Sequence, residues 1–318
     1  MRRSFIVDIN VAKLLKHKHL NGWGLFWLLS VPISLSVIIH GLQTDLSTGE
    51  GVSEMIGYSV RWAVPFIYLV IAASAVQILF PGPFSMWLLR NRKYLGLVFA
   101  VAMAWQGLGI FVVSTIMRDY YFSEIYAFRD ELEGTIGYVF LATLSITSFK
   151  IGSRFITSDQ WKLIHKAGVI FLWAYPFSVY WWNLFYYPYL DGYASPRVID
   201  YFFYAGGFAA FALRLAAWGK IRLMKSAKEA PGVTASRLAR ASGGALIVLG
   251  LVSAVTGHLW YNSVAGILAG PSWSEETSLW LPFWPLEPFL PLLIIGLGIM
   301  LATSVQTAGR STPEAVTN

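Results

Sequence analysis

The sequence contains no cysteine and little charge. Without cysteine, the chain forms no disulfide and offers no thiolate to zinc, to an iron–sulfur cluster or to catalysis. Only 13% of its 318 residues are charged, whereas a soluble domain carries roughly 25%. A glycine-rich phosphate loop, a triad pattern and a flavin- or nicotinamide-binding domain are also missing from the sequence. If the protein moves electrons, donor and acceptor must therefore be other molecules.

Apolar residues make up 56% of the chain and gather in long runs. Runs of about 20 apolar residues are typical of transmembrane helices. We therefore expect an all-α, polytopic membrane helix bundle with eight transmembrane helices. The expected spans are about Gly22–His40, Ile56–Leu79, Leu95–Met117, Thr135–Phe149, Ile164–Leu184, Val198–Trp218, Gly243–Tyr261 and Pro288–Val305.

The charges between these runs alternate in sign. Loops after even-numbered spans are basic: Arg90, Arg92, Lys93, Lys150, Arg154, Lys162, Lys220, Arg222, Lys225, Lys228, Arg237 and Arg240. Loops after odd-numbered spans are acidic: Asp45, Glu50, Glu54, Asp119, Glu124, Asp130, Glu131, Glu133, Asp191, Glu275, Glu276 and Glu287. Because cytoplasmic loops carry the excess of Lys and Arg, this pattern predicts both termini in the cytoplasm. It also explains the net charge of +7 without a nucleic-acid partner.

The domain organisation follows from the same runs. We expect a basic cytoplasmic segment over 1–21, a six-helix membrane core over 22–218 and a basic cytoplasmic loop over 219–242. Two additional transmembrane helices over 243–305 and a cytoplasmic tail over 306–318 complete the chain. The first span follows a long basic segment and lacks a small-residue cleavage site, so we interpret it as retained and not as a signal peptide.

Aromatic residues are frequent near the expected outer ends of the spans, and we interpret them as an interfacial belt. They are Trp181, Trp182, Tyr186, Tyr187, Tyr189, Trp273, Trp280 and Trp284.

Few polar side chains fall within the runs, and an ionisable residue inside a membrane is a candidate functional residue. His165 lies at the threshold of the fifth run, beside Trp161, Lys162 and Lys166, and Gln106 lies near the middle of the third. We expect the His165 ring to donate to a helix-end carbonyl or to bind a headgroup phosphate.

The region around Gln106 and His165 carries a recognisable pattern. A basic run that ends at Lys93 is followed by Leu95-Gly96-Leu97, eight further residues and then Gln106. Two helices later, Trp161 precedes His165 by four positions. This pattern resembles the ferric-reductase-like transmembrane family, and most of all the haem-binding membrane subunits of bacterial periplasmic methionine sulfoxide reductases. The matched region, about Arg90–Trp182, covers under a third of the chain.

The resemblance implies a ferric-reductase-like core over 22–218, with b-type haem held by histidines on the third and fifth helices. The family's third-helix histidine falls on Gln106. The two fifth-helix histidines fall on His165, which is retained, and on Ser178. Since Gln and Ser are poor axial ligands for haem iron, we expect the usual haem to be absent or held differently. His40 and His258, both expected toward the outer face, are the alternative ligand pair for haem iron.

Three functions remain open. The first is an accessory or binding subunit of a membrane redox system, with a degenerate haem site and with a lipid or quinone as ligand. The second is a working b-haem subunit that passes electrons from a cytoplasmic reductase or quinone to a periplasmic partner, and so acts as part of an oxidoreductase. The third is a small-molecule transporter. In each case the bilayer is the surrounding partner.

Overall fold

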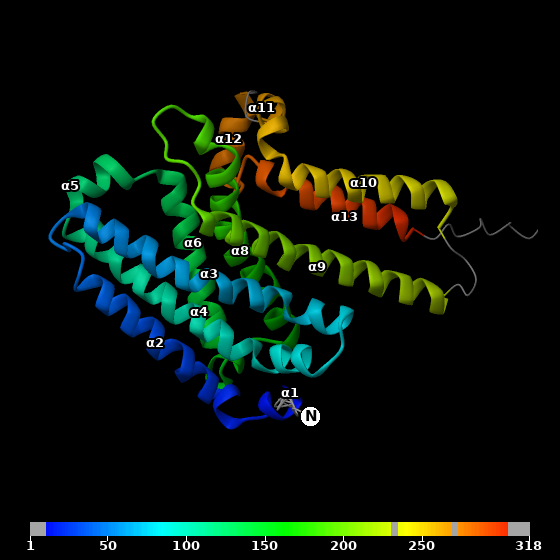
Figure 1. The fold of residues 1–318 in the computed structure, drawn as a ribbon, viewed down its shortest axis with the longest axis horizontal. Helices are drawn as coiled ribbons and strands as arrows, with labels where there is room; N and C mark the ends of the chain where they lie inside the picture. The colour runs from blue at the N-terminus through cyan, green and yellow to red at the C-terminus, as the bar shows by residue number, and fades with distance from the viewer. Residues whose placement is uncertain (1–10, 230–234, 269–271, 305–318) are drawn as a thin grey trace, which may run out of the picture.

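The computed structural model describes residues 11–229, 235–268 and 272–304, which form helices joined by turns and loops without any β-strand (Figure 1). The segment over 1–10 and the tail over 306–318 lie outside the described residues. In chain order the elements are α1 Val11–Leu14, η1 Lys18–Leu20, α2 Trp23–Gly41, α3 Gly49–Leu79, α4 Pro83–Thr115, α5 Arg118–Tyr120, η2 Tyr121–Ile125, α6 Phe128–Thr147, α7 Lys150–Ser153, α8 Ser158–Phe185, η3 Tyr187–Tyr189, α9 Val198–Glu229, α10 Arg237–Val255, α11 Gly257–Leu268, α12 Ser272–Trp280, η4 Glu287–Phe289 and α13 Leu290–Ala302.

Within the described chain, 5 helices are long and apolar enough to cross a bilayer, which makes this a multi-pass membrane protein. They are Trp23–Gly41, Gly49–Leu79, Pro83–Thr115, Val198–Lys228 and Arg237–Val255. The other three expected spans fold as α6, α8 and α13. Helices α6 and α8 begin with polar and charged turns, and α13 has 13 residues.

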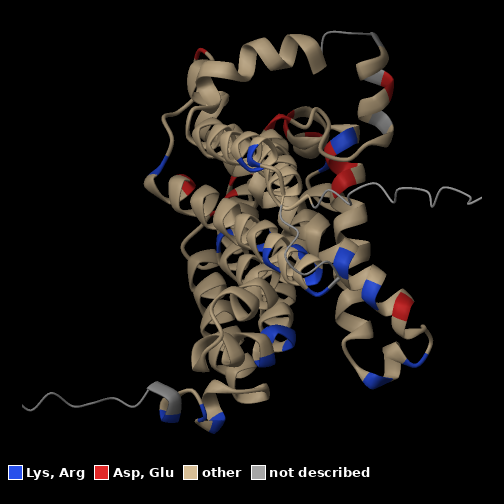
Figure 2. Cartoon of the chain, turned by 90° about the vertical axis from the view of Figure 1, so that its right-hand side faces the viewer, with Lys and Arg blue, Asp and Glu red and all other residues tan. Residues whose placement is uncertain are grey.

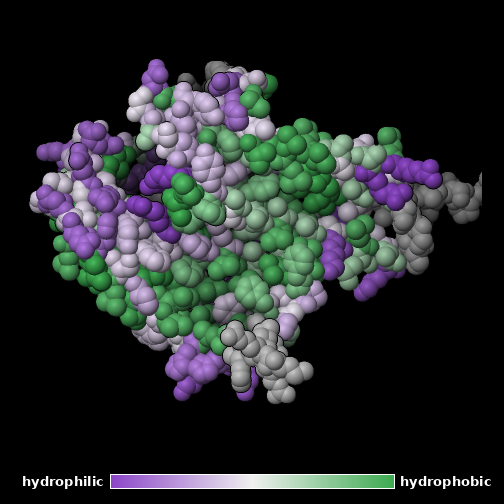
Figure 3. Space-filling view, in the orientation of Figure 1, coloured by the Kyte–Doolittle hydropathy of each residue, from purple (hydrophilic) through white to green (hydrophobic). Residues whose placement is uncertain are grey.

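The outer surface of the bundle is apolar over several helices. Trp27, Leu35 and Ile39 of α2 are about half exposed, as are Leu249 and Val252 of α10. Figure 3 shows hydrophobic residues over these helices and hydrophilic residues toward the ends of the bundle. Because exposed apolar patches of this extent are not found on soluble monomers, this surface contacts lipid.

Helix α3 is central to the bundle and packs against α4 on one side and α9 on the other. Its buried face carries small residues, Ala63, Ala73 and Ala75, which let the neighbouring helices approach closely. The tight turn from α3 to α4 follows from its sequence. Pro83 stands at the start of α4, and the Ser85 hydroxyl accepts a hydrogen bond from the Gly82 N–H (2.9 Å), which caps the helix.

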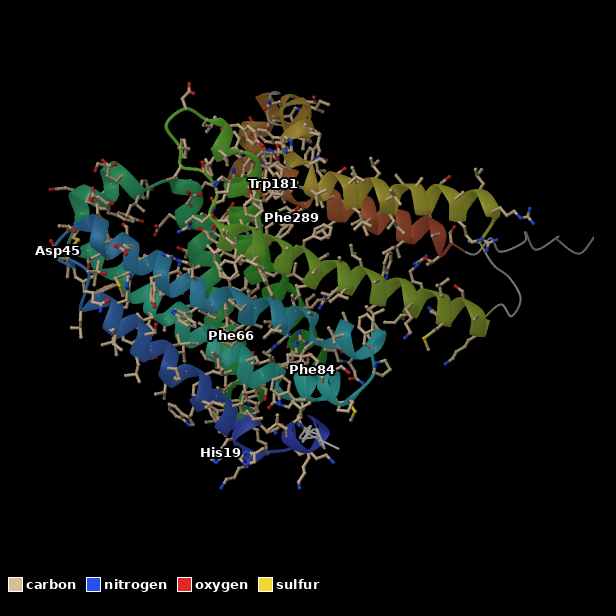
Figure 4. The ribbon with its side chains drawn as sticks, viewed as in Figure 1. His19, Asp45, Phe66, Phe84, Trp181 and Phe289 are labelled. Atoms are coloured by element: carbon tan, nitrogen blue, oxygen red, sulfur yellow. The ribbon has the colours of Figure 1, made fainter. Side chains whose placement is uncertain are left out.

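Charge is distributed unequally along the bundle. Lys and Arg occur mainly at one end, which is formed by the α3–α4 turn, the segment between α6 and α8, and the last turns of α9; Asp and Glu gather at the opposite end (Figure 2). We call these the basic end and the acidic end. His19 lies at the basic end and Asp45 at the acidic end (Figure 4).

The segment before α2 is fixed to α4 by buried amides. The Asn91 side chain, which is fully buried, accepts from the Gly22 N–H (2.9 Å) and donates to the Asn21 side-chain oxygen (3.1 Å). Arg90 donates to the same Asn21 oxygen (2.6 Å), and Trp87 donates to a backbone carbonyl of the segment. The basic residues near Lys18 are therefore held against the start of α4.

Two element boundaries differ from the sequence expectation. Helix α9 continues to Glu229, so much of the segment expected to be a basic loop is helical. The reason is local: Lys220 donates to the Ile78 carbonyl at the end of α3 (2.7 Å), and Arg222 donates to the Thr303 hydroxyl after α13 (2.9 Å). Both contacts hold the extended helix.

The expected seventh span is interrupted. Helix α10 ends at Val255, Thr256 leaves the helical conformation, and α11 begins at Gly257. Gly257 is in close contact with the Phe185 ring, because a Cβ placed on it would lie 2.5 Å from that ring.

The last helices belong to the same bundle. Helices α10 and α13 pack against each other, and α13 also packs against α9. Gly243 and Gly298 face each other across the α10–α13 contact, and a Cβ on either would lie within 2.6 Å of the other's carbonyl oxygen. Small residues at a helix contact permit this approach.

Candidate functional site

His165 joins two helices at the basic end. Helix α8 begins with a capping box, in which Thr157 and Gln160 bond each other's backbone N–H groups, and one helical turn later presents Trp161 and His165. The His165 Nε2 atom lies 2.9 Å from the Thr147 hydroxyl in the last turn of α6. The His165 ring stacks on Trp161 (4.0 Å between centroids), whose N–H donates to the Thr147 carbonyl (3.1 Å). The expected bond from His165 to a helix-end carbonyl is not the one found: the histidine bonds the Thr147 hydroxyl, and Trp161 beside it donates to the Thr147 carbonyl.

A cavity of about 520 Å³ lies beside His165, and we call it the basic cavity. Helices α4, α8 and α9 supply six cationic side chains to its lining, together with His165: Arg90, Arg92, Lys93, Lys162, Lys166 and Arg214. None of the described residues that line it is Asp or Glu. This arrangement repels cations and attracts anions.

Gln106 lines a second cavity of about 790 Å³, which we call the central cavity. Helices α3, α4, α6 and α8 surround it. The Gln106 side-chain oxygen accepts a hydrogen bond from the Tyr138 hydroxyl (3.1 Å), and Gly107 lets the Tyr138 ring approach α4. Most of the wall is apolar, as in ligand-binding pockets of this size.

Ser178 lies in a third environment. Its side chain is 8% exposed, and its hydroxyl donates to the Tyr175 carbonyl one turn earlier (2.9 Å). It is not among the residues that line either cavity. Thirteen residues of helix place it about 20 Å along α8 from His165. Gln106, His165 and Ser178, which the resemblance predicts to occupy haem-ligand positions, are thus not brought together around one space.

His40 and His258 have separate surroundings. The His40 ring stacks on Tyr58 (4.1 Å) and lies 3.1 Å from a Glu54 carboxylate oxygen. His258, on α11, faces the Tyr189 ring at 5.6 Å. Helices α2 and α11 lie apart in Figure 1. The structure therefore does not place these two rings on opposite sides of one cofactor.

Three side chains separate the two cavities. Phe99 of α4, Leu141 of α6 and Leu172 of α8 line both of them, and all three are buried. We call this layer the partition. On one side of the partition, the basic cavity has a cationic lining. On the other side, the lining of the central cavity includes Asp130, Glu131 and Glu133.

The acidic side of the central cavity is held by hydrogen bonds. The Tyr121 hydroxyl donates to the Glu131 carboxylate, while Glu133 pairs with Arg129 (3.2 Å) and accepts from the Phe283 N–H (2.8 Å). Burial, reinforced by the bond to Glu131, raises the pKa of Tyr121 to about 12. The Tyr121 phenol therefore stays protonated at neutral pH.

Only some residues of the expected aromatic belt lie at the protein surface. Trp280 is 85% exposed, whereas Trp181 is 0% exposed and packs against Trp182, Trp260 and Tyr261. In Figure 4, Trp181 and Phe289 lie where α8 meets the C-terminal helices. Trp181 therefore belongs to the core that joins α8 to α11.

The basic cavity is the feature that sequence reasoning missed. Charge counted along the chain places four of its six cations in expected loops, namely Arg90, Arg92, Lys93 and Lys162, and the other two, Lys166 and Arg214, in separate spans. One signal was available: Lys162 and Lys166 are four residues apart with His165 beside them, so they share a face of α8. The contributions of Arg92 and Arg214 depend on helix packing that the sequence does not display.

No protein-family model matches this chain, and neither the search of curated proteins nor that of solved structures found a match.

Proposed function

We propose that the chain is a bacterial inner-membrane protein of the ferric-reductase-like type, with eight spans and both termini in the cytoplasm. Its central cavity binds a lipid- or quinone-like small molecule, and it serves a membrane redox system as an accessory or binding subunit. The recognisable pattern over Arg90–Trp182 and the concentration of Lys and Arg in the loops after even-numbered spans support this proposal.

The observation that carries the proposal is the composition of the central cavity. It has about 790 Å³ of space between the helices that would clamp haem, yet no described residue that lines it is a histidine. Gln106, at the position of the missing ligand, is already engaged with Tyr138. An apolar wall with a few hydrogen-bonding groups suits a ring or an acyl chain better than an iron that needs two imidazoles.

The test compares the purified protein with a variant whose central cavity is filled. Gly134 lines the cavity, and a Cβ placed on it meets nothing within 4 Å, so Gly134→Leu adds bulk without a clash. Gly244 on α10 is equally open but lies outside the cavity, and Gly244→Leu is the matched control. We expect organic extracts of the wild type and of the control to contain a stoichiometric quinone or lipid, which Gly134→Leu loses.

The absorption spectrum decides between this function and haem-based electron transfer. A colourless protein with an extractable ligand supports the proposal. A reversible reduced-minus-oxidised haem spectrum would overturn it in favour of the working b-haem subunit, and equal ligand content in both variants would also contradict it.

A second candidate, small-molecule transport, is favoured by the partition. Two cavities that approach each other from the basic and acidic ends, separated by three side chains, form the kind of path that alternating access requires. Uptake of the extracted ligand into proteoliposomes, lost in Gly134→Leu, would support transport over an accessory role.

A further inference from the structure

The cations around the basic cavity are only partly compensated. Arg92 and Lys166 have no hydrogen-bond or ion-pair partner among the described residues, and Arg92 lies near enough to Arg214 for their like charges to repel. Lys162 is paired with Asp159 (3.1 Å) at an exposed position. Arg92 and Arg214 are half-buried, and uncompensated charge of one sign at half-buried positions is costly unless an anion joins it.

The cations come from different helices. Arg92 lies on α4, Lys166 on α8 and Arg214 on α9, so an anion in the cavity would be contacted from three sides. Arg214 donates one N–H to the Ile71 carbonyl (3.2 Å), and this bond fixes its guanidinium. The other N–H donors of the guanidinium can bind a ligand. A phosphate group, with several acceptor oxygens, matches such a convergence of guanidinium and ammonium groups.

The rest of the lining is apolar. Ile67, Phe99 and Leu172 form part of the wall, so the 520 Å³ space is cationic in one part and hydrocarbon-like in another. His165 also lines the space, with its Nε2 engaged by Thr147 and its ring face covered by Trp161. A ligand that carries both a phosphate and an apolar portion fits this division.

We propose that the basic cavity binds a phosphate-bearing anion, held by Arg92, Lys166 and Arg214. The source of the phosphate is either a phospholipid headgroup or a soluble phosphate compound. This site lies on the other side of the partition from the central cavity and does not depend on what the central cavity binds.

The experiment uses the full chain in two settings. In detergent, thermal unfolding is followed during titration with glycerol phosphate. In nanodiscs, unfolding is compared between phosphatidylcholine alone and phosphatidylcholine mixed with phosphatidylglycerol. The variants are Arg92→Gln and Lys166→Gln; Lys166 is exposed, so its variant keeps the test sound if Arg92→Gln fails to fold. Lys150→Gln, an exposed lysine of the basic end that does not line the cavity, is the charge-matched control.

We expect the wild type and Lys150→Gln to be stabilised by the phosphate probe, and each cavity variant to require roughly tenfold more of it, as the loss of one charge-assisted hydrogen bond implies. If phosphatidylglycerol stabilises the protein and glycerol phosphate does not, the ligand is a lipid headgroup. If glycerol phosphate stabilises the protein, the ligand is a soluble phosphate compound. The proposal is overturned if neither probe stabilises the wild type. It is also overturned if Lys150→Gln reduces the stabilisation by the probe as much as Lys166→Gln does.

Discussion

His165 has a structural role that is independent of any haem. Its ring bonds Thr147 and covers Trp161, and through them it ties the end of α6 to the start of α8. This contact needs no cofactor. The sequence shows the residue and its depth, but the partner on α6 becomes visible only once the helices are packed.

We predict that His165→Ala lowers the free energy of unfolding by about 1–2 kcal/mol, since one hydrogen bond and one ring stack are lost. Thr147→Val should cost a similar amount, and the double variant should cost less than the sum, because both changes remove the same bond. Thermal unfolding in detergent measures all three. His19→Ala, at an exposed site, is the control. Strictly additive losses would show that the two side chains do not interact.

Tyr121 should make the protein sensitive to alkali. An unfolded tyrosine releases its proton near pH 10, whereas the folded pKa of Tyr121 is about 12. Between these values the unfolded state binds fewer protons than the folded state, so stability falls as pH rises. Tyr121→Phe should flatten the decline of the melting temperature from about pH 10 to pH 12. Tyr189→Phe, at a side chain that is 63% exposed, should leave this decline unchanged. If the melting temperatures of both variants decline equally with pH, Tyr121 is not the group responsible.

At the scale of elements, the helices follow closely from the apolar runs. Each expected span overlaps a helix. A run of this length that is apolar on every face is typical of a helix that is buried or surrounded by lipid. The exceptions have local causes. The extension of α9 depends on contacts of Lys220 and Arg222 with other helices, and the break before Gly257 depends on the Phe185 ring. The pattern of apolar runs along the chain does not predict such contacts between helices.

Adjacent glycines on α10 provide a test of the helix packing. A Cβ on Gly243 would lie 2.5 Å from the Gly298 carbonyl oxygen, so Gly243→Ala must push α10 and α13 apart, at a cost of roughly 1–3 kcal/mol. A Cβ on Gly244 meets nothing within 4 Å, and Gly244→Ala should stabilise the helix by about 0.5–1 kcal/mol. Melting temperatures that move in opposite directions would confirm the contact, and a harmless Gly243→Ala would contradict it.

At the scale of the whole molecule, the cysteine-free sequence makes the proposed topology directly measurable. Single cysteines introduced at exposed positions should react with a membrane-impermeant maleimide according to the side they face. Ser123→Cys and Ala194→Cys should be labelled on intact spheroplasts, and Ser158→Cys only after lysis, because α6 and α8 each cross the bilayer in the eight-span arrangement. The parent chain, without cysteine, gives the background. Labelling of Ser158→Cys from outside would exclude these two crossings.

The candidate sites were less predictable than the helices. The family resemblance singles out His165 as a retained position and Gln106 and Ser178 as substituted ones, but their separation into three environments is a property of the packed bundle. The basic cavity takes cations from α4, α8 and α9, which are distant in the chain, and charge counted by loop cannot reveal such a convergence.

The partition has an electrical consequence. Where water fills a recess, its interior stays close to the potential of the adjoining solution, so the voltage across the membrane falls mainly over the dry layer that remains. If water rather than a ligand filled both cavities of this bundle, that layer would be Phe99, Leu141 and Leu172. A charge that crossed only these three side chains would then traverse much of the field, worth about 2.3 kcal/mol per 100 mV for the full drop.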